Sequence, residues 1–120
     1  MAGVKFVADM SPEDLHQAAR HVAKETGFAV HASGGLAFEA KKGNFTLSIV
    51  AGALVAYCDF KIVVEPYDDD GAELILTRNT PWWTGAIGLS RTKSWAKTLA
   101  DNIKKEVERS GFQVLKEKEF

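Results

Sequence analysis

The residues best suited to binding chemistry are two adjacent tryptophans, Trp82 and Trp83, in the glycine-containing connector 80–89. A tryptophan buries about 150–250 Å² when it finds an apolar environment, so we expect this connector to dock on something. One interpretation is structural, with a ring closing an open end of the protein's own core. The other is functional, with the rings forming an anchor for a partner or an apolar ligand.

Nearby side chains extend the functional interpretation. In it Trp82, Trp83 and Ile87 contact the ligand, Tyr57 offers a polar hydroxyl, and Arg91 meets an acidic headgroup. Residues 85–92 are expected to precede a helix, where backbone N–H groups and Arg91 could hold a phosphate or carboxylate. The segment lacks both the GK[ST] ending of a phosphate loop and the GxGxxG spacing of dinucleotide sites, so a helix cap with a solvated arginine is the alternative.

The histidines and the single cysteine have no spacing typical of a metal site. His16 and His21 are five residues apart, or about 140° around a helix, so they cannot hold one ion together, and we interpret both as surface residues. A catalytic pair of Cys58 and His31 with Asp59 is conceivable. Strand alternation places Cys58 on the apolar face and Asp59 on the opposite one, which favours a buried, inert thiol. We therefore expect no metal and no cofactor.

Two charged segments also have ordinary explanations. The run 68–70 consists of three aspartates but lacks the alternating ligands and distal glutamate of a calcium loop, so we expect a solvated turn. The lysines after position 92 could form a face for nucleic acid or a membrane surface, but Asp101, Glu106 and Glu108 dilute their charge.

Composition limits the function classes further. The 120 residues are 46% hydrophobic, which suits one compact domain, and the formal net charge of −1 provides no field to attract nucleic acid. Cys58 is the only cysteine, which excludes an internal disulfide and makes the cytoplasm the expected location. The longest apolar run, 49–58, is about half of what a bilayer span needs, so we expect no membrane insertion.

Local patterns predict the elements at the start of the chain. Alternation over 3–9 predicts a short strand. Ser11, Pro12 and two following acids then predict a helix over 11–26, and Gly27 with Phe28 predicts its end through a left-handed cap.

The middle of the chain predicts an antiparallel meander. Strand-like runs separated by turn residues cover 28–33, 35–41, 45–51, 54–65 and 72–79. Phe38, Phe60 and Leu74 share the apolar face, whereas Tyr57 and Asp59 are expected on the wet one. Pro66 is expected to end the long fourth strand.

The last third predicts one long helix. Trp95, Leu99, Ile103 and Val107 stand four residues apart, which indicates an amphipathic helix of about five turns. Gly111 and Phe112 repeat the capping pattern of the first helix. A strand over 112–117 or a mobile tail follows, and the charged residues 116–119 are expected to be disordered.

These elements predict an α+β fold in which a predominantly antiparallel sheet of five to seven strands carries two helices on one face. The expected order is one strand, a helix, five strands, a helix and a final strand. In outline this resembles the TATA-binding-protein-like fold and, more loosely, the helix-grip fold of START-type lipid-binding proteins. The resemblance concerns element order alone, so neither DNA binding nor sterol binding is implied. It does imply that a cavity can form between a curved sheet and a long helix.

The leading functional hypothesis is a non-enzymatic domain that binds an apolar or amphipathic small molecule or lipid between the sheet and the C-terminal helix. The alternative is a protein-interaction module, in one version a homodimer, that uses the Trp82–Trp83 loop or a sheet edge. An enzyme would require the fold to bring together distant residues such as Tyr57, His31 and Arg91.

Overall fold

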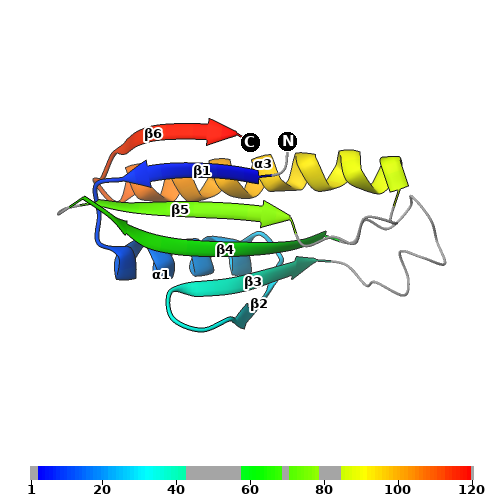
Figure 1. Cartoon of the computed structure of the whole chain (residues 1–120), viewed down its shortest axis with the longest axis horizontal. Helices are drawn as coiled ribbons and strands as arrows, with labels where there is room; N and C mark the ends of the chain where they lie inside the picture. Colours follow the sequence, from blue (N-terminus) through cyan, green and yellow to red (C-terminus); the bar gives the residue numbers. More distant parts are fainter. Residues whose placement is uncertain (1–2, 43–57, 69–70, 79–84, 120) are drawn as a thin grey trace.

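The computed structural model describes residues 3–42, 58–68, 71–78 and 85–119, with the side chains of residues 42, 58 and 85–95 outside the description. Eight elements follow one another in this described part of the chain (Figure 1). They are β1 (Gly3–Ala8), α1 (Pro12–Glu25), β2 (Ala29–Ala32), β3 (Ala37–Lys42), β4 (Cys58–Tyr67), β5 (Gly71–Arg78), α3 (Gly85–Arg109) and β6 (Val114–Glu119).

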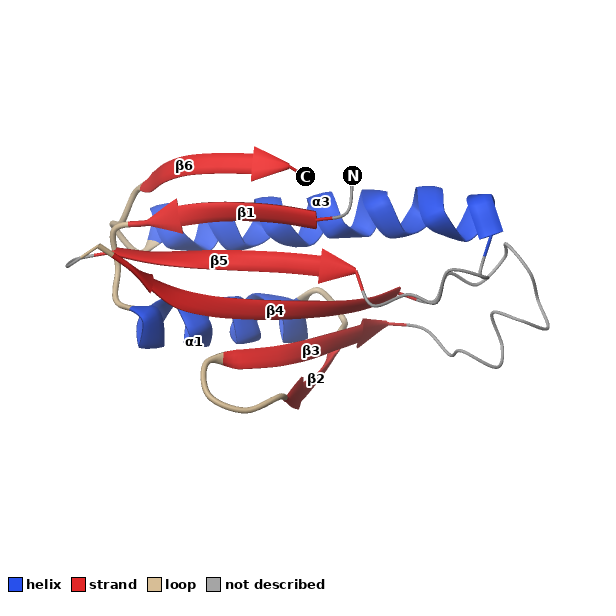
Figure 2. Ribbon diagram, viewed as in Figure 1, coloured by secondary structure: helices blue, strands red, loops and turns tan. Residues whose placement is uncertain are grey.

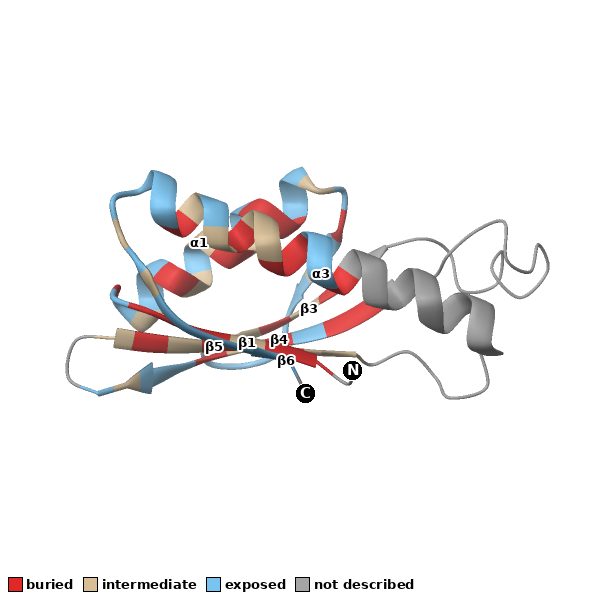
Figure 3. Cartoon of the chain, turned by 90° about the horizontal axis from the view of Figure 1, so that it is seen from above, coloured by how far each residue is buried: buried red, intermediate tan, exposed pale blue. Residues whose placement is uncertain are grey.

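The strands form one antiparallel sheet in the order β2-β3-β4-β5-β1-β6. Both helices lie on the same face of this sheet, and they pack against each other as well as against the strands (Figures 2 and 3). The other face, which we call the outer face, carries neither of these two helices. The predicted α+β class and the placement of two helices on one face are confirmed. The predicted strand 45–51 and positions 54–57 lie outside the described residues.

The two helices end in the same way, as their sequences predict. Gly27 and Gly111 adopt left-handed φ values of 98° and 91°. The amide of Phe28 then donates to the carbonyl of Ala23 at 2.9 Å, and the amide of Phe112 donates to the carbonyl of Val107 at 3.1 Å. These bonds return the chain toward the sheet and satisfy carbonyls that the helix itself leaves free.

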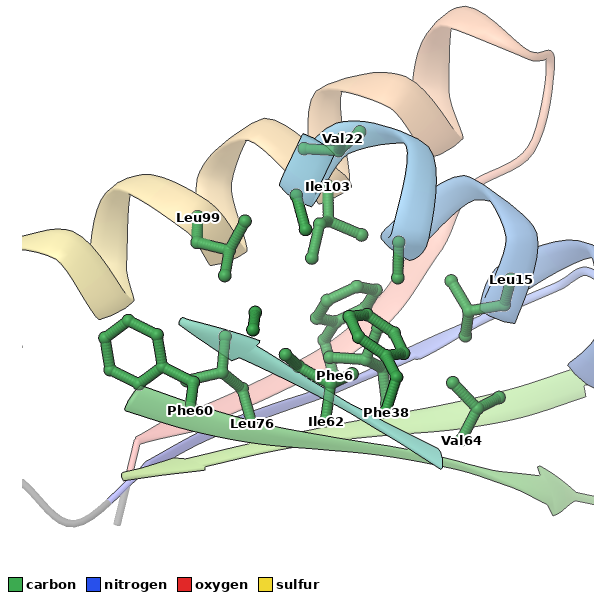
Figure 4. Close-up of a cluster of buried hydrophobic side chains, with 14 of the residues drawn as sticks. Phe6, Leu15, Val22, Phe38, Phe60, Ile62, Val64, Leu76, Leu99 and Ile103 are labelled. Atoms are coloured by element: carbon green, nitrogen blue, oxygen red, sulfur yellow. The ribbon is translucent and has the colours of Figure 1, made fainter. Parts of the chain in front are cut away.

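Alternation along the strands places the large apolar side chains against the helices. Phe6, Phe38, Phe60 and Ile62 rise from the sheet toward side chains such as Leu99 on α3 (Figure 4). All five are at most 1% exposed, so solvent does not reach this part of the interior. The face assignments made for Phe38, Phe60 and Leu74 are confirmed.

Three boundaries differ from the sequence predictions. Residues 85–92, expected to precede the helix, belong to α3, which begins at Gly85. Pro66 lies inside β4 rather than at its end. Residues 116–119, expected to be disordered, form β6 and pair with β1.

Pro66 is tolerated because β3 does not extend alongside it. The first residue of β3, Ala37, pairs with Val63 of β4. The amide of Val64 donates to the carbonyl of Leu36 at 2.9 Å. Beyond Val64, β4 has no residues paired with β3. The nitrogen of Pro66, two residues on, points to the same side as that of Val64, where no described strand needs a donor.

Asp59 also differs from expectation. Its register places it opposite Lys41, on the outer face predicted for it, yet the residue is only 9% exposed. The Lys41 ammonium lies 4.0 Å from the Asp59 carboxylate. The period of the strand therefore predicted the direction of this side chain correctly but not its burial.

Candidate functional site

The segments that carry the predicted site residues start from one end of the sheet. Lys42 at the end of β3 lies opposite Cys58 at the start of β4, and Arg78 at the end of β5 lies opposite Phe60. Gly85 begins α3 at the same end of the molecule (Figure 1). The residues that flank the segments 43–57 and 79–84 therefore all lie at one end of the fold.

Three of the predicted ligand-binding residues belong to those flanked segments. Tyr57 directly precedes Cys58, while Trp82 and Trp83 lie between Arg78 and Gly85. All three lie outside the described residues, so their contacts remain predictions. Their attachment points on the described chain nevertheless lie at one end of the fold.

The other two predicted residues, Ile87 and Arg91, lie in the first turns of α3, and their side chains are outside the description. This placement corrects the expected anion site. The free amides of a helix belong to its first turn, which here begins at Gly85, whereas Arg91 lies six residues further on. The prediction that Arg91 and a loop of free amides lie together at the start of the helix is therefore wrong.

The C-terminal half of α3 covers a closed interior. Leu99, Ile103 and Val107 are all 0% exposed, and Leu99 and Ile103 face the aromatic side chains of the sheet (Figure 4). A ligand held between the sheet and α3 therefore has to enter on the Gly85 side of Ala96, which is itself only 4% exposed.

A hollow of about 340 Å³ lies between the helices on their solvent side. Its walls include Val22 of α1, Thr26 directly after that helix, and Lys105 and Arg109 from α3. Arg109 donates to Glu106 at 2.5–3.0 Å, and this hydrogen bond raises the pKa of the guanidinium. Charged surface pairs of this kind are typical of a solvated helix face.

His16 corrects the interpretation of both helix-one histidines as surface residues. Its ring lies edge-on to that of Phe38, with centroids 5.6 Å apart, and the residue is partly buried between α1 and β3. Burial lowers the pKa of His16, and the positive charge of Arg20 lowers it further. His21 is exposed, as expected, and contacts Glu25 at 3.1 Å. The burial of His16 could not be predicted from the spacing of the histidines, because it depends on the position of β3.

The fold places the candidate catalytic residues His31 and Cys58 on strands that are not neighbours. His31 on β2 lies opposite Glu39, and Glu39 lies opposite Lys61 on β4. Cys58 is three residues away from Lys61 along β4, with β3 between it and β2. Within the described ranges, no three potential ligands from histidine, cysteine and the acids approach closely enough to hold a metal ion. Asp68 adopts a left-handed turn conformation, and the other two aspartates of 68–70 lie outside the description.

Neither helix in the described part of the chain has the length and apolarity required to cross a bilayer. When the chain is compared with models of protein families and with curated proteins, no family and no curated protein matches it.

Proposed function

We propose that this protein is a non-enzymatic cytoplasmic domain that binds an apolar or amphipathic small molecule or lipid. The site lies at the end of the sheet where β3 and β5 end and β4 and α3 begin. The observation that carries the proposal is the topology, which anchors the flanks of Tyr57, of Trp82 and Trp83, and of Ile87 at this one end.

The length of α3 supports this location. The helix starts at Gly85, and its described core contacts start at Ala96, 11 residues later. Its N-terminal turns extend past the ends of β1 and β5 (Figure 1). An amphipathic helix that projects beyond a sheet offers apolar surface that a ligand can cover.

The composition of the attached segments supports the ligand class. The segment 43–57 contains a long apolar run, and 79–84 contains both adjacent tryptophans. Sites for small molecules are mostly apolar and have a few polar groups that fix orientation. Tyr57 and Arg91 are the polar groups in this proposal, with Arg91 meeting an acidic headgroup.

Tryptophan emission tests the proposal directly. The full-length protein is titrated with dodecanoate and, separately, with dodecanol, below the concentrations at which either aggregates. We expect a saturable change in emission with both. We expect Arg91→Gln to weaken dodecanoate binding about tenfold and to leave dodecanol binding unchanged, because only the carboxylate offers an ion pair.

A dye-displacement assay is needed for variants that lack the reporter rings. Trp82→Ala with Trp83→Ala should abolish displacement of an apolar fluorescent dye by dodecanoate. The matched control is Leu115→Ala, which removes exposed apolar surface from β6, where Leu115 is 54% exposed. Absence of saturable binding by wild type, or equal binding by both variants, contradicts the proposal.

A protein-interaction module is the second candidate, and the edge strand β2 favours it. β2 has a described neighbour on one side only, and Ala29, His31 and Ala32 are exposed. An exposed, uncharged edge can accept an added strand from a second copy of the chain.

Sizing by light scattering tests this second candidate. The amide of Ser33 donates to the carbonyl of Ala37, so the amide of Ala32 points away from β3. Ala32→Pro removes this outward donor and should dissociate a dimer formed through β2. A monomer at all concentrations excludes the homodimer, and a dimer that survives Ala32→Pro excludes this edge as its interface.

A further inference from the structure

The outer face of the sheet carries a second hollow, of about 390 Å³, that the ligand site proposed above does not use. Lys5 and Val7 of β1 form its centre, with Lys116 and Lys118 of β6 on one side and Glu73 of β5 on the other. Tyr67, at the end of β4, completes the wall. The hollow is therefore built from four strands on the outer face, opposite α1 and α3.

Two of the lysines that line this hollow occupy directly opposite positions on neighbouring strands. Lys5 and Lys118 are register partners on neighbouring antiparallel strands, so their side chains leave the sheet on the same face. Like charges at directly opposite positions destabilise a sheet. Lys116, two residues before Lys118, adds a third positive charge to the same hollow.

The hollow is lined by fewer carboxylates than lysines. Glu73 is opposite Val7 and lines the hollow on the outer face. Glu117 also lines it, but its carboxylate accepts a hydrogen bond from Lys104 of α3, on the helix side of the sheet. Among the described residues that line the hollow, three lysines and the Glu73 carboxylate lie on the outer face, and Glu65 lies opposite Glu73 on β4.

The wall of the hollow is held in place by a contact that spans the sheet. The Lys116 ammonium donates to the hydroxyl of Tyr67 at 3.3 Å and lies 5.8 Å from the centroid of its ring. Val7 is only 3% exposed although it lies on the outer face, away from α1 and α3, so it gives the hollow an apolar floor. The Tyr67 hydroxyl can still donate its own proton to a ligand.

We infer that this hollow binds a compact multivalent anion, namely a phosphate group, either free or as a monoester. The phosphate oxygens accept hydrogen bonds from Lys5, Lys116 and Lys118, and the bound negative charge offsets the positive charges that these lysines bring to one hollow. Tyr67 and Val7 supply apolar surface beside it, which suits the organic part of a monoester.

The test is an NMR titration of the full chain with inorganic phosphate and, separately, with phenyl phosphate, at constant ionic strength set with chloride. We expect saturable shifts of the Lys5, Val7 and Lys118 amides. The double variant Lys5→Gln with Lys118→Gln should weaken binding at least tenfold. The control variant Lys97→Gln with Lys105→Gln removes the same charge from exposed positions on α3 and should bind as wild type does.

A second variant distinguishes loss of phosphate binding from loss of folding in the double variant. Lys118→Glu places opposite charges at the Lys5 pair, so its melting midpoint in low-salt chloride should rise while its response to phosphate disappears. Tighter binding of phenyl phosphate identifies a monoester as the ligand, and tighter binding of inorganic phosphate identifies the free anion. Shifts that do not saturate, or that persist in both outer-face variants, overturn the inference.

Discussion

The Lys104 side chain of α3 donates a hydrogen bond to the Glu117 carboxylate of β6 and so ties the last strand of the sheet to the long helix. Its ammonium also lies 3.1 Å from the Asp101 carboxylate, and its side chain is only 14% exposed. This contact anchors a strand that its own charged sequence predicts to be disordered.

Loss of the Lys104 contact should loosen β6. We expect Lys104→Met to lower the free energy of unfolding by about 1 kcal/mol at neutral pH, because Glu117 and Asp101 are partly solvated. Urea denaturation measures this change. Lys97→Met, at an exposed position on the same helix, should change the free energy of unfolding by less than about 0.5 kcal/mol.

The same contact predicts a dependence on alkaline pH. Burial alone lowers the pKa of Lys104, but the hydrogen bonds with Glu117 and Asp101, together with their charges, outweigh burial, and the pKa is raised above 10.5. The stabilisation is therefore complete below pH 10.5 and is lost as the pH rises through the folded-state pKa. The difference in unfolding free energy between wild type and Lys104→Met should shrink over that range, and a constant difference would contradict this assignment.

His16 predicts a dependence in the acid range. Burial against Phe38, with a further contribution from Arg20, lowers its pKa below 6.5, so the unfolded chain binds this proton more readily than the folded one. Protonation of His16 therefore does not reduce the free energy of unfolding above pH 6.5. It reduces this free energy increasingly as the pH drops from 6.5 toward the folded-state pKa. Denaturation at pH 7.5 and pH 5.5 should show a smaller loss for His16→Gln than for wild type. His21→Gln, at an exposed position, should retain the wild-type loss.

Gly71 cannot accept a side chain without displacing backbone. A Cβ atom there would lie 3.0 Å from the Tyr67 carbonyl oxygen and 3.1 Å from that of Ala8. We expect Gly71→Ala to destabilise the protein by about 1–3 kcal/mol, because strands on both sides would have to move. Thermal melting tests this, with Glu73→Ala on the same strand as a control that creates no clash. A melting midpoint for Gly71→Ala equal to that of wild type would show that the strands separate easily.

Gly111 is needed for its conformation rather than for space. It adopts a φ of 91°, and nothing lies within 4 Å of where its Cβ would be. Gly111→Ala should therefore cost about 1 kcal/mol through backbone strain alone. Gly111→Asn should recover part of that loss, since asparagine tolerates left-handed backbone better than alanine does. Equal losses for the two variants would point to a contact rather than to backbone conformation.

Features set by neighbouring residues were predictable from the sequence. Ser11 caps α1 by accepting the amide of Asp14 at 3.2 Å, and Gly27 ends that helix with a left-handed turn. These effects act within one helical turn, so the local residue pattern contains the necessary information.

The start of α3 was missed for a physical reason. Gly85 and Gly88 each disfavour a helix by about 1 kcal/mol relative to alanine, which predicted a loop. Residues Leu99 to Val107 pack in the core and stabilise the helix, and adding turns to an existing helix costs less than starting one. The predicted ligand-binding residues Tyr57, Trp82, Trp83, Ile87 and Arg91 were chosen by type and spacing. The sequence could not show that the described residues next to these positions would lie together at the end of the sheet where β3 and β5 end.

The sequence by itself determined which segments form helices and strands over most of the described chain, and which face of each is apolar, because both follow from periodicity over a few residues. Only the tertiary structure decided that β1 lies between β5 and β6. That choice pairs Lys5 with Lys118, gives residues 116–119 a partner, and forms the hollow beside Tyr67. Strand neighbours are set by contacts between residues about a hundred positions apart, and a local pattern contains no record of them.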